Sequence, residues 1–204
     1  MQKECNKIMI TKRDQDILNF VTDFHVVTLN QIHRLLFKNI SLRYTQKRLE
    51  YLFKQGYIKR TKSTIDNSFA YYIDKKPCQI HHDLIRAELF VNLKNRYTVL
   101  EWNNELPVVN IRPDAMAYFK DSSFSYINDN GIVFPVFIEI HINNKFNFQK
   151  YIDLLKNNDL KLMFGIMPRV VICTDRDIKI PNSIGIKFKI VDLDNMQGID
   201  SLFR

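Results

Sequence analysis

The spacing of apolar residues changes from helical to alternating at Gly56, and this change most constrains the fold of the first third of the chain. Before it, apolar residues recur three and four positions apart, as on one face of an α-helix. After it, residues 57–62 and 69–73 read as strands, with turn-forming residues 63–68 between them. The pattern predicts three helices followed by a β-hairpin, which is the element order of a winged helix-turn-helix.

Capping residues divide the helical part into three helices. Thr11 can cap the first helix, and Thr28 can start the second through a capping box in which Gln31 reaches back to the backbone. Ser41 can cap the third, and Gly56 suits a left-handed cap at its end. The expected helices cover residues 12–24, 29–37 and 42 to about 54.

Positive charge is concentrated in the same segment. Residues 1–75 hold 14 Lys and Arg against 7 Asp and Glu, whereas residues 76–204 hold 16 against 15. An excess of one charge on a small unit indicates binding to an anion, and nucleic acid is the first candidate. A lysine-rich surface that is only solvated is the alternative interpretation of the charge.

The outward face of the third expected helix carries residue types that bind DNA. Arg and Gln can each form two hydrogen bonds to a base edge, and Lys and Tyr suit phosphates. Because a helix enters the major groove by its amino-terminal end, Arg43, Gln46 and Lys47 are expected nearest the bases. A three-helix packing module with a solvated basic face is the alternative. With the basic residues of the expected wing, the candidate DNA-binding set is Ser41, Arg43, Tyr44, Gln46, Lys47, Arg48, Lys54, Lys59, Arg60 and Lys62.

Residues 77–204 predict a small α/β domain, separated from residues 1–76 at Pro77. An amphipathic helix over about 81–97 precedes three strands, a helix and two further strands. This order predicts a mixed sheet with helices on its faces, so the whole chain is expected to be α+β. The expected strands lie at 98–102, 111–119, 132–142, 169–174 and 186–191, and Phe148, Tyr151, Ile152 and Leu155 mark the second helix.

Two carboxylates lie within expected strands, where acidic side chains are unfavourable unless they have a role. Asp114 is in one strand, and Glu139 precedes His141 near the end of the next. On neighbouring strands the two carboxylates could hold Mg²⁺, with Glu88 from the preceding helix as a third ligand. Such a metal could activate water against a phosphodiester. The alternative is a non-catalytic pair that Arg112 or backbone donors hold in place.

This arrangement resembles the PD-(D/E)xK nuclease fold, in which a strand with Pro-Asp and a strand with Glu-x-Lys precede a helix and two strands. The resemblance implies that Asp114, Glu139 and the residue at position 141 are catalytic. It also implies a lysine at position 141, where this chain has His141. Lysine supplies a cation beside the phosphate, whereas a neutral histidine does not. Lys145 or Lys150 could supply that cation instead.

The two halves together resemble the replication-relaxation family of plasmids and other mobile elements, over about residues 10–192. The resemblance implies a winged-helix DNA-binding protein that acts in replication or transfer, with no established catalytic activity. It rests on short motifs in order, which are Thr-Lys-Arg-Asp-Gln-Asp-Ile-Leu at 11–18, Leu-x-Gln-Ile-His-Arg-Leu-Leu-Phe at 29–37, Arg-Leu at 48–49, Gly-Tyr-Ile at 56–58, His-Asp-Leu at 82–84, Arg-Pro-Asp-Ala at 112–115 and Phe-Ile-Glu at 137–139.

These observations support three functions. The leading hypothesis is sequence-preferring binding of double-stranded DNA, which needs no cofactor. The second is a DNA endonuclease, which alone would need Mg²⁺. The third is a module that forms a homodimer or recruits replication or conjugation proteins. No apolar run approaches the roughly 20 residues of a membrane helix, and three widely spaced cysteines without a secretory signal indicate the cytoplasm.

Overall fold

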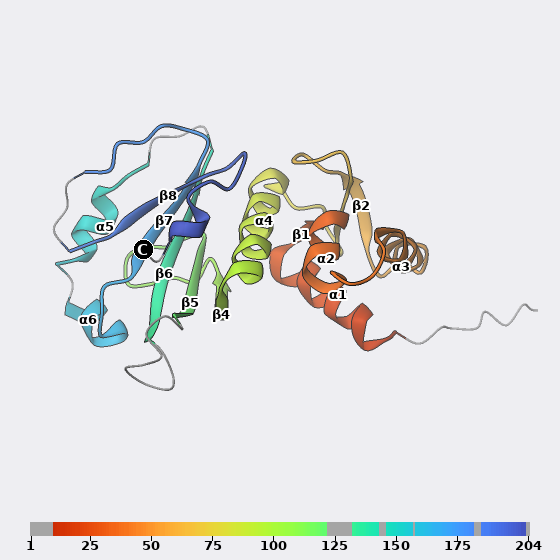
Figure 1. Ribbon diagram of the computed structural model, residues 1–204, viewed down its shortest axis with the longest axis horizontal. Helices are drawn as coiled ribbons and strands as arrows, with labels where there is room; N and C mark the ends of the chain where they lie inside the picture. The colour runs from red at the N-terminus through yellow and green to blue at the C-terminus, as the bar shows by residue number, and fades with distance from the viewer. Residues whose placement is uncertain (1–9, 122–131, 143–145, 157, 182–184, 203–204) are drawn as a thin grey trace, which may run out of the picture. The chain divides into compact units, whose positions relative to one another are not determined.

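The computed structural model describes residues 10–121, 132–142, 146–156, 158–181 and 185–202. The chain divides into two compact units, residues 1–84 and 85–204. The division falls within helix α4 (Ile80–Arg96), later than the boundary at residue 76 that the sequence indicated (Figure 1). One unit contains a three-stranded sheet and the other a five-stranded sheet, each combined with helices, so the expected α+β class is confirmed.

The capping residues predict the helix boundaries of the first unit well. Thr11 and Thr28 each form a capping box, and the Ser41 hydroxyl accepts a hydrogen bond from a backbone amide. Gly56 has a φ of 78° and ends the third helix as a left-handed cap. The elements of this unit are α1 (Lys12–Phe24), β1 (Val26–Thr28), α2 (Leu29–Leu36), α3 (Leu42–Lys54), β2 (Lys59–Lys62) and β3 (Phe69–Tyr72).

Strand β1 is an element that the sequence did not predict. It has three residues, all buried, which is too short for an alternating pattern to be recognised. It pairs antiparallel with β3, and β3 pairs antiparallel with β2. The sheet therefore has the order β1-β3-β2, which leaves β2 at an edge.

A buried ion pair joins α1 to α3. Asp14 is fully buried, and its carboxylate accepts hydrogen bonds from the Nε and Nη2 of Arg48 while it also closes the capping box of Thr11. Burial alone would raise the pKa of Asp14, but the hydrogen bonds from Arg48 and Thr11 outweigh it and hold the pKa below its ordinary value. The pair therefore fixes α3 against α1. The apolar core of this unit includes Ile17, Phe20, Val21, Ile32, Leu49 and Leu52.

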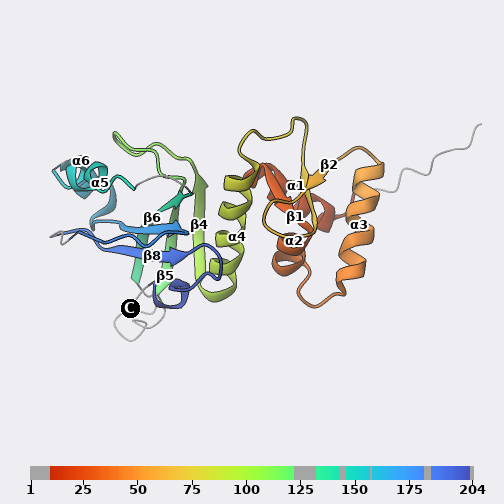
Figure 2. The same cartoon turned by 90° about the horizontal axis from the view of Figure 1, so that it is seen from above.

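The second unit contains a mixed sheet, as the element order predicted. Its strand order is β4-β5-β6-β7-β8, antiparallel from β4 to β6 and parallel from β6 to β8 (Figures 1 and 2). One helix, α6 (Asn158–Phe164), was not expected, because its seven residues are too few for a helical repeat to be recognised in the sequence. After α4 the elements are β4 (Thr98–Asn104), β5 (Ala115–Asp121), β6 (Ile132–His141), α5 (Gln149–Leu154), α6 (Asn158–Phe164), β7 (Arg169–Thr174), β8 (Phe188–Asp192) and a 3₁₀ turn (Ile199–Ser201).

Strand β5 begins at Ala115, later than the sequence indicated. Ile111 instead forms an isolated bridge with Val108, and Pro113 has no amide hydrogen to donate to a ladder. Asp114 therefore immediately precedes the strand and is not part of it. Helix α5 packs against the sheet through a buried cluster that includes Met116, Phe137, Tyr151, Leu154 and Val170.

Asp14→Ala is expected to destabilise the first unit by about 3 kcal/mol, because it removes a helix cap and leaves Arg48 without its buried partner. Urea unfolding near neutral pH measures this loss. Because the native pKa of Asp14 is depressed, its stabilising effect is present above the unfolded pKa of about 3.9 and is lost as the pH falls through the native pKa. The difference between wild type and variant should therefore shrink in acid.

Asp16→Ala is the matched control, since Asp16 is on the same helix but is not buried. It should change the free energy of unfolding by no more than about 0.5 kcal/mol. Equal effects of the two substitutions would contradict the role given to Asp14.

Candidate functional site

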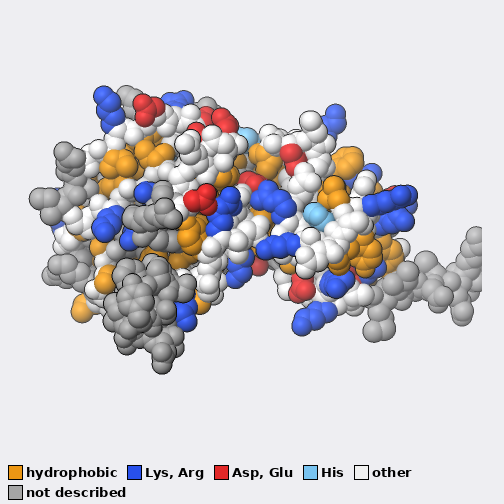
Figure 3. Space-filling view, in the orientation of Figure 1, with side chains coloured by type: hydrophobic (Ala, Val, Ile, Leu, Met, Phe, Trp, Pro, Cys, Tyr) orange, Lys and Arg blue, Asp and Glu red, His pale blue; other side chains and the backbone are white. Residues whose placement is uncertain are grey.

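Three of the candidate DNA-binding side chains are exposed on α3 without a partner. No described residue forms a hydrogen bond or ion pair with the side chains of Arg43, Gln46 or Lys47. Figures 1 and 2 show α3 at the margin of the first unit, and Figure 3 shows Lys and Arg side chains gathered at this end of the unit. These three side chains are therefore available to a ligand.

The other candidates on α3 are partly engaged within the protein. Lys54 lies 2.9 Å from Glu50 in an exposed pair, so the carboxyl-terminal half of the helix contributes little net charge. Tyr44 is 46% exposed, and its ring packs against Phe37 of the preceding segment. Ser41 caps the helix. The positive charge of α3 is therefore concentrated near its amino-terminal end, at Arg43 and Lys47.

Arg48 is the clearest departure from the sequence-based assignment. It was grouped with the DNA-binding residues because it lies among Arg and Lys in the sequence. In the structure its guanidinium binds the buried carboxylate of Asp14 and stacks over the ring of Tyr51, 4.7 Å from the centroid. A guanidinium with both of these contacts holds α3 against α1, so the partly buried Arg48 has a structural role within the unit.

The basic residues of the β2–β3 hairpin differ in how firmly they are held. The guanidinium of Arg60 lies between the rings of Phe53 and Phe69, 4.3 and 4.4 Å from their centroids. Lys59 donates a hydrogen bond to the carbonyl of Asp74. Lys62 is exposed, and none of the described residues pairs with it. Arg60 therefore links the hairpin to α3 and positions it.

The loop between β2 and β3 is organised by Asp66. Its carboxylate accepts hydrogen bonds from the amide and hydroxyl of Ser68, at 3.0 and 2.7 Å, and from the side chain of Asn30 on α2, at 2.8 Å. Burial would raise the pKa of Asp66, but the hydrogen bonds from Ser68, Ser63 and Asn30 hold the pKa below its ordinary value. The hairpin is therefore attached to α2 as well as to α3.

In the second unit, the structure brings together the two carboxylates that the sequence singled out. Ala115 pairs with Ile138 in the antiparallel β5–β6 ladder, so Asp114 lies opposite Glu139. The Oδ2 of Asp114 accepts a hydrogen bond of 2.6 Å from the amide of Ile140. Glu139 is only 4% exposed. Two acidic groups therefore share one end of the sheet.

Glu139 is held by residues of α5 and by its own strand. Its Oε1 accepts hydrogen bonds from Lys150, at 2.7 Å, and from the hydroxyl of Tyr151, and its Oε2 lies 3.6 Å from the Nε2 of His141. Burial, together with the charge of Glu139, raises the pKa of Tyr151, so this phenol stays protonated. Because the Nζ of Lys150 lies 2.7 Å from Glu139, Lys150 is the lysine that places a positive charge beside the carboxylates. The other candidate for that charge, Lys145, lies outside the described residues.

Glu88 is not shown to be a third ligand. Its carboxylate accepts a hydrogen bond of 2.8 Å from Asn92 on the same helix. Within the described ranges, no group of three or more His, Cys, Asp or Glu side chains could hold a metal ion. Mg²⁺ needs only one or two protein carboxylates, because it keeps several waters. Asp114 and Glu139 fit that smaller donor set, since they face each other across one ladder.

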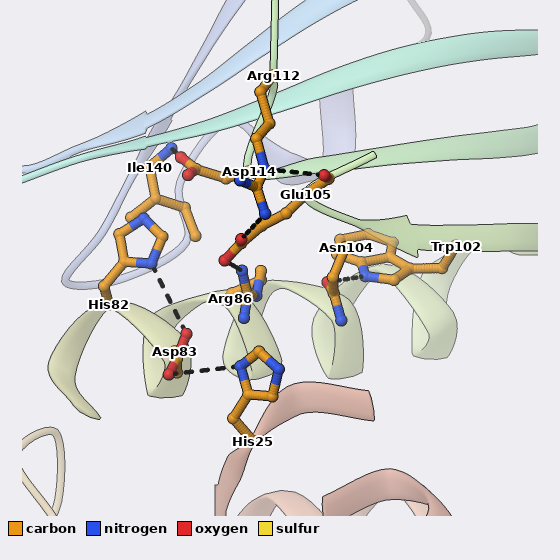
Figure 4. Close-up of polar contacts among 10 residues, drawn as sticks. All are labelled: His25, His82, Asp83, Arg86, Trp102, Asn104, Glu105, Arg112, Asp114 and Ile140. Carbon is orange, nitrogen blue, oxygen red and sulfur yellow. Dashed lines mark hydrogen bonds and ion pairs between the residues drawn. The ribbon is translucent and has the colours of Figure 1, made fainter. Parts of the chain in front are cut away.

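A cluster of charged residues beside this end of the sheet was not predicted. Figure 4 shows Glu105 between two arginines, with Arg86 at 3.0 Å and Arg112 at 2.7 Å from its carboxylate oxygens. Arg86 is fully buried in a segment of α4 whose neighbours are apolar, so its sequence context gives no sign of the pair. The sequence left open whether Arg112 or a backbone donor holds Asp114. In the structure a backbone donor, the amide of Ile140, binds the carboxylate of Asp114, and Arg112 binds Glu105.

Comparisons with known proteins place the chain near no characterised relative. No family model matches it, and no curated protein does. Among solved structures it is similar to the crystal structure of protein VC1899 from Vibrio cholerae, with 10% sequence identity and a TM-score of 0.37. The match covers 80% of this chain and 42% of that longer protein. A similarity this distant says nothing about function. None of the described helices has the length and hydropathy that a membrane crossing requires.

Tyr151→Phe is expected to destabilise the second unit by about 1.5–3 kcal/mol, because it removes the hydroxyl that donates to the buried carboxylate of Glu139. Chemical denaturation followed by fluorescence or circular dichroism measures the loss. The matched control is Tyr118→Phe, because Tyr118 packs against the same cluster and its hydroxyl has no hydrogen-bond partner among the described residues. A loss as large in the control would refute the role of the hydroxyl.

Proposed function

We propose that this chain is a sequence-preferring, double-stranded DNA-binding protein whose first unit is a winged helix-turn-helix. The observation that carries the proposal is the set of unpaired Arg43, Gln46 and Lys47 side chains on one exposed helix, beside an edge strand with Lys59 and Lys62. Arg and Gln read base edges, and Lys binds phosphate. The same set combines both kinds of contact.

The element order of the first unit supports this proposal. Three helices followed by a hairpin, with a short strand between the first two helices, give the sheet order β1-β3-β2. In this arrangement α3 is the recognition helix and β2–β3 is the wing. Arg60 between Phe53 and Phe69 holds the wing against the helix, so both would meet the duplex in a fixed geometry.

The electrostatics of the chain agree with binding to a polyanion. The excess charge of the chain lies almost entirely in residues 1–75. Each phosphate that a Lys or Arg neutralises releases counterions, which gives a slope of about −0.9 in log affinity against log salt. Arg43, Lys47 and Lys62 are the exposed side chains from which such contacts would be made.

The wider role that we propose follows the family resemblance. The motifs shared with replication-relaxation proteins favour a part in replication, transfer or regulation of a plasmid or other mobile element. Binding to the replicon that carries the gene is the direct consequence of that role. Selection of bound fragments from this replicon, followed by footprinting, tests it and reports whether the site has two symmetric halves, as a homodimer would require.

Arg43→Ala is expected to cost about 1–3 kcal/mol of discrimination between the preferred site and a single-base variant of it, because a bidentate base contact is lost. Lys62→Ala should weaken binding to all duplexes alike and reduce the salt slope by about 1. Fluorescence anisotropy titrations at several salt concentrations measure both effects.

Lys156→Ala is the matched control, because Lys156 is an exposed lysine on the second unit, paired with Asp153. It should leave the affinity and the salt slope unchanged. The proposal fails if the wild-type chain binds no duplex at low salt, or if Lys156→Ala weakens binding as much as Lys62→Ala.

A second candidate function is a metal-dependent DNA endonuclease. It is favoured by one observation, the convergence of Asp114, Glu139 and Lys150 at one end of the sheet. Asp114 and Glu139 would hold Mg²⁺, which when bound activates water and stabilises charge on a phosphodiester. Lys150 would neutralise charge near the scissile phosphate, and the Tyr151 hydroxyl holds Glu139 in place.

If the chain is a metal-dependent endonuclease, it should nick supercoiled plasmid in the presence of Mg²⁺ or Mn²⁺, and the substitution Asp114→Ala should abolish the nicking. Glu101→Ala is the control, since Glu101 is an exposed acid on β4. Agarose gels resolve the nicked and supercoiled forms. The candidate is rejected if wild type does not nick, or if nicking survives in Asp114→Ala.

A further inference from the structure

A series of charged contacts in the second unit ends at an exposed arginine. The guanidinium of Arg86 lies 3.0 Å from one carboxylate oxygen of Glu105, and the guanidinium of Arg112 lies 2.7 Å from the other (Figure 4). The side chain of Arg86 is fully buried, whereas that of Arg112 is 65% exposed. The contacts therefore run from the interior of the unit to its surface.

Glu105 fixes the guanidinium of Arg112 in one position. Arg112 donates from Nη2 to the carboxylate of Glu105 and from Nε to its backbone carbonyl, the latter at 3.0 Å. Glu105 has a φ of 51°, a conformation that a residue other than glycine adopts at a cost in energy. A buried ion pair adds little net stability. The cost of burying Arg86 and of straining Glu105 is therefore explained by the position that they give to Arg112.

The fixed guanidinium still has donors for a ligand. A guanidinium carries five N–H groups, and Glu105 accepts from one at Nε and one at Nη2 of Arg112. No other described residue forms a hydrogen bond or ion pair with this side chain. The N–H groups of Nη1 are therefore available on an exposed and preorganised cation, which suits the oxygens of a phosphate.

Arg112 lies at the end of the sheet that carries the two carboxylates. It precedes Asp114 by two residues, and the amide of Glu105 donates a hydrogen bond of 3.1 Å to the carbonyl of Asp114. Asp114 lies opposite Glu139, whose carboxylate binds Lys150. Two cations from different parts of the unit, Arg112 and Lys150, are therefore placed beside this pair of carboxylates.

We propose that Arg112 binds a phosphate of a nucleic acid strand at this end of the sheet, and that Glu105 and Arg86 are its positioning residues. This inference rests on the second candidate function, because that function places a phosphodiester beside Asp114 and Glu139. It deepens that function by naming the residue that anchors the strand. Because the contact requires no cleavage, it can be measured where no bond is broken.

The test measures binding of a single strand to the full-length chain in a buffer without divalent cations. The probe is a short fluorescein-labelled oligothymidylate. Arg43→Ala, Lys47→Ala and Lys62→Ala together form the background chain, so that the proposed duplex-binding surface contributes little. Adding Arg112→Ala should weaken binding about tenfold and reduce the salt slope by about 0.7, the value for one phosphate of a single strand. Fluorescence anisotropy titrations at several salt concentrations measure both effects.

A second variant separates positioning from simple charge. Glu105→Gln removes a negative charge beside Arg112, so it should tighten binding if Glu105 only repels the strand. If Glu105 positions Arg112, the same substitution should weaken binding about threefold, because a guanidinium without a fixed orientation loses more entropy on binding. Lys187→Ala is the matched control, since Lys187 is an exposed lysine of the same unit. It should leave the affinity and the salt slope of the background chain unchanged.

The inference is overturned if the background chain binds no strand, if Arg112→Ala weakens binding no more than Lys187→Ala does, or if Glu105→Gln tightens it. Thermal melting followed by circular dichroism checks that each variant is folded. Arg112→Ala removes an exposed side chain, so it decides the question even if Glu105→Gln does not fold. Plasmid nicking that is lost in Asp114→Ala, together with unchanged binding by Arg112→Ala, would overturn this inference and leave the second candidate function standing.

Discussion

The ion pair between Asp14 and Arg48 is the interaction on which the first unit depends. A fully buried carboxylate is stable only when its hydrogen-bonding capacity is met, and here both oxygens are used. The pair sets the position of α3 relative to α1. Since α3 carries Arg43, Gln46 and Lys47, the geometry of the proposed reading surface depends on a contact on the opposite side of the helix.

At one end of the sheet in the second unit, a nearly buried carboxylate is again held by hydrogen bonds from other parts of the protein. Glu139 is nearly buried and receives hydrogen bonds from Lys150 and Tyr151, both from one helix. Such contacts stabilise the carboxylate, and they also place a cation beside two acidic groups. The same residues therefore serve packing and would serve the second candidate function, and only measurements of activity separate the two.

Local signals in the sequence predicted the helices of the first unit because capping is a short-range interaction. Thr11, Thr28 and Ser41 each act on an amide three residues away, so their roles are visible in the sequence. The pairing of Asp14 with Arg48 spans 34 residues, and that of Arg86 with Glu105 spans 19. Neither leaves a local pattern. Asp114 and Glu139 were found because an acidic residue in an apolar strand segment is itself a local signal, whereas the contacts of Lys150 and Tyr151 with Glu139 span 11 and 12 residues and were not found.

Strand β2 has a second consequence for the behaviour of this protein. An edge strand exposes unpaired backbone groups, to which a strand of another molecule can add. Three of the four residues of β2 are basic and exposed, so a like strand that approached would meet strong repulsion. The charges that are proposed to contact DNA thus also protect the edge from self-association. Chains in which these charges are removed together should become prone to aggregate, independently of any loss of binding.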